Sequence, residues 1–214
     1  VIDASGLKND GDVTNNSGGI INASGGNEKD YIGWNGKLFE NSGNFDATGG
    51  SASGAHGAYL TEEVTNYASM TFTGGSNSSA YGAVIVGYLR SYEDAAISVF
   101  GSESSIAQGL KIGTANDEAE LMNLGVINAN GRKGSALYLV NGTIDNEEYG
   151  TVNLNGGDGA GAFIYKGEFI NKGTVNLSAT VANKAIKLGT NGTYSQTVDK
   201  AVTNGNLLSF MDYA

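Results

Sequence analysis

The sequence predicts an all-β fold, a right-handed parallel β-helix with about seven to eight coils of roughly 25 residues. Three observations predict it: one pattern returns throughout the chain, apolar and polar residues alternate within each repeat, and Gly-rich turns separate the alternating stretches. Repeats of this length are typical of solenoids, whose units bury a shared core only by stacking. The positions that we expect in that core recur 23 to 30 residues apart: Ile21, Phe45, Met70, Ile97, Ile127, Val152 and Val175.

Each repeat contains three short stretches that we expect to form strands. The first alternates with period two, as in 44–48 and 174–177, which places its apolar residues on one face. A second apolar pair follows a variable loop, as in 58–60, and a third piece ends with an apolar residue just before an Asn. Matching strands of neighbouring coils would pair in parallel about 4.8 Å apart and form three sheets around one core. Right-handed winding is the default for parallel crossovers.

A recurrent asparagine precedes the first apolar position of several repeats by four residues. Asn tolerates turn conformations, and its amide can bond to turn backbone. Stacked in successive coils, these residues are expected to form a structural ladder of side-chain hydrogen bonds: Asn41, Asn66, Asn123 and Asn171.

The composition favours one folded segment over residues 1–214. The chain has 34 Gly, no Pro and no Cys, and 40% of its residues are hydrophobic, which is enough for a core. The first ten residues lack the basic and apolar regions of a signal peptide, and no apolar run is long enough for a transmembrane helix. We therefore expect a piece excised from a longer protein.

Charge and side-chain chemistry exclude several functions. The net charge is −10 and Arg90 and Arg132 are the only arginines, so we expect no nucleic-acid partner. The absence of Cys removes thiolate chemistry, and the single His56 has no evident catalytic partners. The glycine-rich stretch 156–161 lacks the Lys-Ser/Thr of a phosphate-binding loop. We expect no cofactor and no metal.

The period is longest around Ile97, where we expect irregular loops near 86–96 and 113–120. Insertions in a solenoid map to surface loops, often on the binding face. The first segment carries Tyr88, Arg90 and Tyr92, residue types favoured at interaction sites. We therefore predict these three as binding residues, with Trp34 as an alternative.

An enzymatic alternative remains open, because parallel β-helices include polysaccharide lyases and hydrolases that place carboxylates on one sheet face. Adjacent acids such as Glu62 and Glu63 point to opposite faces of a strand and do not form a catalytic pair. Glu63 and Glu148 would align on one face only across several coils.

The pattern resembles the passenger domain of bacterial autotransporters (type V secretion), over roughly residues 16 to 190. The residues that carry the likeness include the stretches 41–45, 57–60 and 171–175. The resemblance implies a non-enzymatic adhesin displayed on, or secreted from, the Gram-negative outer membrane. Its partner would be a host-cell or bacterial surface protein or glycan, or another copy of itself.

Other parts of the family pattern are missing from this sequence. It lacks the C-terminal membrane β-barrel, which is the only part that would contact the membrane. It also lacks the Gly-Asp-Ser-Gly motif of the protease branch. A segment of an autotransporter toxin is the second alternative, because toxin passengers have a similar pattern.

Overall fold

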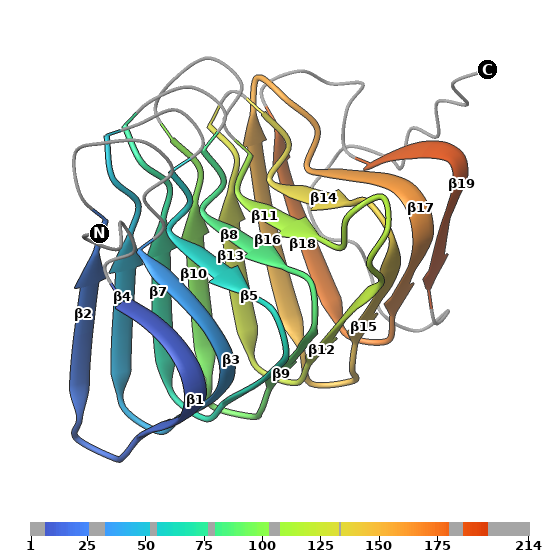
Figure 1. The fold of residues 1–214 in the computed structure, drawn as a ribbon. Coiled ribbons are helices and arrows are strands. Elements are labelled where there is room, and N and C mark those ends of the chain that lie inside the picture. The colour runs from blue at the N-terminus through green and yellow to red at the C-terminus, as the bar shows by residue number, and fades with distance from the viewer. Residues whose placement is uncertain are drawn as a thin grey trace.

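A computed structural model describes residues 7–25, 33–51, 55–76, 80–102, 108–132, 134–179 and 186–196. In these ranges every regular element is a strand, and the strands form a parallel β-solenoid of about six turns (Figure 1). The expected all-β, parallel repeat fold is therefore confirmed. The coil count of seven to eight, the three strands per coil and the right-handed winding stay predictions. None of the described residues forms a helix that could cross a membrane.

One side of the solenoid is a seven-stranded parallel sheet, in which each strand pairs with its counterpart in the next coil (Figure 1). Its strands alternate buried and outward residues, as period-two patterning requires. In chain order they are β2 (Ile20–Ser24), β4 (Asn44–Thr48), β7 (Ser69–Thr73), β10 (Ala96–Phe100), β13 (Val126–Asn130), β16 (Thr151–Gly157) and β18 (Thr174–Ala179).

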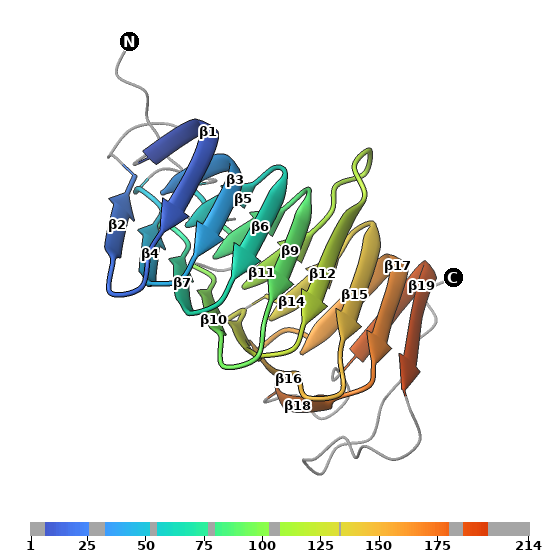
Figure 2. The same cartoon turned by 90° about the horizontal axis from the view of Figure 1, so that it is seen from below.

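The other strands form a single twelve-stranded sheet with two arms. The first arm holds β5 (Ala58–Leu60), β8 (Ala83–Ile85), β11 (Leu110–Ile112) and β14 (Leu137–Leu139). The second arm, which lies toward the viewer in Figure 2, holds β6 (Glu63–Asn66), β9 (Tyr88–Ser91), β12 (Ala119–Asn123) and β15 (Gly142–Asn146). Long strands at the two ends are β1 (Leu7–Asn15), β3 (Trp34–Asn41), β17 (Ala162–Asn171) and β19 (Ile186–Gln196).

The long strands explain why the structure has two hydrogen-bonded sheets where three were expected. β3 pairs with β5 through its first residues and with β6 through its last, and β17 pairs with β14 and β15 in the same way. Each long strand therefore continues around a corner that the inner coils turn with separate strands. The two arms merge into one sheet at both ends.

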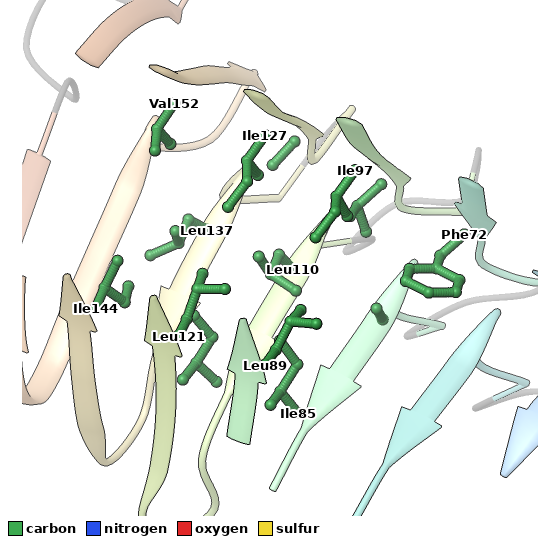
Figure 3. Packing of buried hydrophobic residues seen from close by; sticks show 14 of the residues in the cluster. Phe72, Ile85, Leu89, Ile97, Leu110, Leu121, Ile127, Leu137, Ile144 and Val152 are labelled. Atoms are coloured by element: carbon green, nitrogen blue, oxygen red, sulfur yellow. The ribbon is translucent and has the colours of Figure 1, made fainter. Parts of the chain in front are cut away.

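The core is one continuous cluster along the axis, with contributions from all three rows of strands. Figure 3 shows Ile97 and Ile127 of the seven-stranded sheet pointing toward Leu89 and Leu121 of the second arm. Of the residues expected there, six are buried: Phe45, Met70, Ile97, Ile127, Val152 and Val175. Ile21, near the N-terminal end, is only partly buried and packs against the cluster.

A buried row of carboxamides runs beside this apolar core, and we call it the inner asparagine row. The side chain of Asn15 donates to Asn41 Oδ1 (2.8 Å), and Asn41 donates to Asn66 Oδ1 (2.9 Å). Further along, Asn123 donates to Asn146 Oδ1 and Asn146 to Asn171 Oδ1, both at 2.8 Å. The four expected ladder residues all lie in this row.

The segment around 86–96 was expected to be an irregular loop, and this expectation was wrong. Tyr88–Ser91 forms β9, which pairs in register with β6 and β12. The extra residues are taken up by a tight turn in which the Ala95 N–H donates to Tyr92 O (3.1 Å), with Asp94 at φ 65°. The second segment is irregular only up to Glu118, because β12 begins at Ala119.

Candidate binding surface

The second arm of the twelve-stranded sheet presents two of the predicted binding residues to solvent. In β9 the residues alternate, so Leu89 and Ser91 are buried whereas Tyr88 and Arg90 point outward. Tyr88 is 52% exposed, which is high for an aromatic side chain in the middle of a sheet. The period of two that fills the core therefore also places this Tyr and this Arg side by side on the outer face.

Carboxylates of the neighbouring strands flank these residues. Tyr88 pairs with Glu63 of β6 on one side and with Glu120 of β12 on the other. Arg90 Nη1 lies 3.5 Å from Glu63 Oε1, and both side chains are nearly half exposed. A pair this exposed stabilises the fold little, so the guanidinium remains available to a partner.

Tyr92 lies at the edge of the same face and stacks on Tyr67. Tyr67 directly follows Asn66 of the inner asparagine row, and Tyr92 directly follows Ser91, which pairs with Asn66. The backbone N–H of each tyrosine donates to a backbone carbonyl of the preceding coil. The ring centroids are 4.6 Å apart with an interplanar angle of 22°. This separation matches the spacing of about 4.8 Å between paired strands, so the coil geometry itself produces the stack.

The stack changes the acidity of one of its phenols. The pKa of Tyr67 lies above its ordinary value, first because packing desolvates the hydroxyl and then because the charges of Tyr92 and Glu40 oppose ionisation. Tyr67 therefore stays a neutral hydrogen-bonding group beyond the usual range of pH.

We call Tyr67, Tyr88, Arg90 and Tyr92 the tyrosine–arginine face. Beside it, a hollow of about 100 Å³ lies between Tyr88, Glu118 and Glu120. Tyr and Arg combine apolar contact area with directional hydrogen bonds, which suits a protein or glycan surface. Tyr67 was not among the predicted binding residues, although its position 25 residues before Tyr92 repeats the coil period.

Trp34, the alternative binding residue, is not on any surface, so its assignment as an interaction residue was wrong. Its side chain is fully buried, and its ring meets Phe45 edge-on with centroids 5.1 Å apart. Trp34 pairs with Ala58 in the next coil, and Ala83 follows at the same position. These small inward residues are the first arm's counterpart of Trp34, so the tryptophan belongs to the core.

Glu63 and Glu148, the acids of the enzymatic alternative, do not converge. Glu63 is on β6, whereas Glu148 lies in the turn after β15, three strand pairings further along the arm. At about 4.8 Å per pairing the separation is on the order of 14 Å, too long for a carboxylate pair acting on one bond. In the part of the chain that the structure describes, no group of three His, Cys, Asp or Glu residues is arranged to hold a metal ion.

The geometry therefore defines a repeat solenoid whose second arm presents tyrosines and one arginine among carboxylates. No protein-family model, curated protein or solved structure matches the chain.

Proposed function

We propose that this chain is a segment of a surface-displayed or secreted autotransporter passenger that acts in adhesion or self-association. It works as a binding surface on a rigid rod and not as an enzyme. The partner is a surface protein or glycan of a host or bacterial cell, or a second copy of the chain.

The observation that carries the proposal is the gathering of two exposed tyrosines, Tyr67 and Tyr88, with the half-buried Tyr92 and with Arg90 on adjacent coils of the second arm. In the neighbouring coils the position of Tyr88 holds Glu63 and Glu120, and that of Arg90 holds Thr65 and Met122, so the Tyr and the Arg are particular to this coil. Tyrosine rings lose little conformational entropy on binding, which suits them to contact a partner surface.

We also propose a regular coil architecture for this rod. We take the coils to wind right-handedly and to number seven to eight, with three strands in each regular coil. The seven strands of one sheet support this count. A rod of stacked coils holds its binding face at a fixed distance from the surface that carries it.

A bead assay tests this function directly. Beads coated with the 214-residue chain are mixed with one another and with epithelial or bacterial cells, and clumping or adhesion is counted. We expect Tyr88→Ser combined with Arg90→Ser and Tyr92→Ser to abolish the signal, with the urea midpoint of unfolding lowered only slightly because all three side chains are partly or largely exposed.

The matched control removes exposed tyrosines elsewhere. Tyr149 and Tyr165 are 70% and 50% exposed and lie outside the tyrosine–arginine face, so Tyr149→Ser with Tyr165→Ser should leave adhesion unchanged. Equal loss in both variants would mean non-specific stickiness. Depolymerisation of an acidic polysaccharide by the purified chain would favour the enzymatic alternative instead.

A further inference from the structure

A groove runs along the outer face of the seven-stranded sheet, on a different side from the tyrosine–arginine face. It has a volume of about 330 Å³ and crosses the strands β10, β13, β16 and β18. Figure 1 shows these four strands in adjacent positions of the sheet. Three pairings of about 4.8 Å make it on the order of 14 Å long, parallel to the solenoid axis. A linear molecule in it would meet a lining side chain of each successive coil.

Two rows of outward side chains form the walls of this groove, which we call the axial groove. One wall is the row Asn128, Asn153 and Asn176. The other wall is the row Phe100, Asn130, Asn155 and Ser178. The residues between the rows, such as Ala129 and Leu154, turn their side chains into the core, so the floor is backbone.

The hydrogen bonds of the walls leave donors and acceptors for a ligand. Asn130 Oδ1 accepts from the Arg132 N–H (2.9 Å), and Asn155 Oδ1 accepts from the Gly157 N–H (3.1 Å). No hydrogen bond of the described residues uses the Nδ2 group of either asparagine. On the opposite wall Asn153 donates to Asn128 Oδ1 (2.8 Å). This bond uses one of the two amide hydrogens of Asn153 and leaves the other for a ligand.

The groove is uncharged, although the chain carries a net charge of −10. A phosphate, a sulfate or a cation placed in it would find no counter-charge among the lining residues. The half-buried ring of Phe100 forms the wall at β10 and offers an aromatic surface on which polarised C–H groups pack. Carboxamides together with one aromatic ring suit a molecule that is rich in hydroxyl groups and has apolar ring faces.

An extended peptide fits this place less well. Peptide strands bind through main-chain hydrogen bonds to a sheet edge, whereas the floor here is a sheet face whose backbone groups pair between coils. We infer that the axial groove binds an extended, uncharged oligosaccharide that lies along the solenoid axis. Its pyranose units are close in length to the spacing of the coils, so successive rings meet successive asparagines. This site goes beyond the proposed function and does not depend on the tyrosine–arginine face.

Titration calorimetry of the full chain with cellohexaose and chitohexaose tests the inference, with oligogalacturonate as the charged comparison. We expect saturable binding of at least one neutral hexamer and none of oligogalacturonate. Asn155→Asp keeps the oxygen that accepts from Gly157 but removes the amide donor, and Phe100→Ala removes the ring. Each should weaken binding about tenfold, the cost of one or two lost contacts.

Asn44→Asp is the control, because it adds the same charge to an exposed position of the same sheet outside the groove. It should bind as the wild type does, and so should the triple variant of Tyr88, Arg90 and Tyr92, which separates this site from the proposed adhesive face. The inference is overturned if no neutral hexamer binds, if binding survives both groove substitutions, or if a neutral extended peptide binds there in preference to the sugars.

Discussion

The hydroxyl oxygen of Ser91 and the amide oxygen of Asn123 are buried without a hydrogen-bond partner, although the two residues pair directly across β9 and β12. Ser91 occupies the position that Asn66 holds in the preceding coil. Its side chain is too short to reach either neighbour, so the inner asparagine row is interrupted there.

Replacing Ser91 with Asn should close this gap. The new carboxamide can accept from Asn66 and donate to the Oδ1 atom of Asn123, as its counterparts do elsewhere in the row. Satisfying these buried groups should raise the free energy of unfolding by about 1–2 kcal/mol, measured by urea denaturation. Ser98→Asn, on the outer face of β10, is the control and should change stability by less than about 0.5 kcal/mol. A Ser91→Asn variant no more stable than the wild type would refute this account of the row.

The inner and outer asparagines should differ sharply in their tolerance of charge. Asn146 is fully buried and donates to Asn171, whereas Asn153 stands on the outer face. Asn146→Asp removes a buried donor and introduces a charge, so it should cost more than about 3 kcal/mol. Asn153→Asp should cost about 1 kcal/mol or less. Urea midpoints of the two variants, compared at neutral pH, give the difference, and equal losses would show that burial does not distinguish the rows.

Trp34 should behave as a core residue in both stability and spectroscopy. Trp34→Ala should destabilise the chain by about 3–5 kcal/mol, because it empties the space beside Phe45. Since Trp34 is the single tryptophan, intrinsic fluorescence reports on this place alone. Emission should shift to longer wavelength on unfolding, and external quenchers should have little effect on the folded chain. Strong quenching before unfolding would contradict the burial.

Lys172 should add a stabilising contribution that disappears at high pH. Its Nζ lies 2.9 Å from Asp145 Oδ2 and 3.0 Å from Glu147 Oε1, and these hydrogen bonds raise its pKa above the ordinary 10.5. A raised pKa gives stability that is present in full below 10.5 and is lost as pH rises through the folded-state value. Lys172→Met should therefore cost about 1 kcal/mol or less at neutral pH, since the pair is partly exposed, and nothing once Lys172 is deprotonated.

Lys111 provides the control of opposite sign. Its Nζ lies 5.0 Å from the centre of the Tyr81 ring, and burial lowers its pKa. A lowered pKa penalises the folded state at neutral pH, and the penalty is relieved as pH rises toward 10.5. The stability of the wild type relative to Lys111→Met should therefore increase with pH, whereas relative to Lys172→Met it should fall. Parallel trends in the two urea series would contradict both assignments.

The fold class was predictable because every coil carries its own copy of the signal. Alternation within β4, β13 and β18 and the return of the pattern after about 25 residues are local properties, independent of distant contacts. The ladder was only partly predictable. Asn15 and Asn146 belong to it but precede their apolar residues by six positions instead of four, because a tight turn adds two residues. A fixed spacing therefore misses them.

The candidate surfaces depended on register, which the sequence does not display directly. Tyr88 and Arg90 were identifiable from residue type, but their place on a strand and the contact of Tyr92 with Tyr67 required the pairing of β9 with β6. Trp34 was misplaced because its inward position becomes evident only when it is aligned with Ala58. The axial groove combines outward residues of four strands, which only the register between coils brings together.

The gap at Ser91 also gives the rod a point of low resistance. In an array whose units touch only their neighbours, total stability is close to a sum over junctions, and the junctions on either side of β9 lack the carboxamide bonds found at others. Pulled from its two ends, such a filament would part there first and leave two shorter blocks, each still held by its own run of amides.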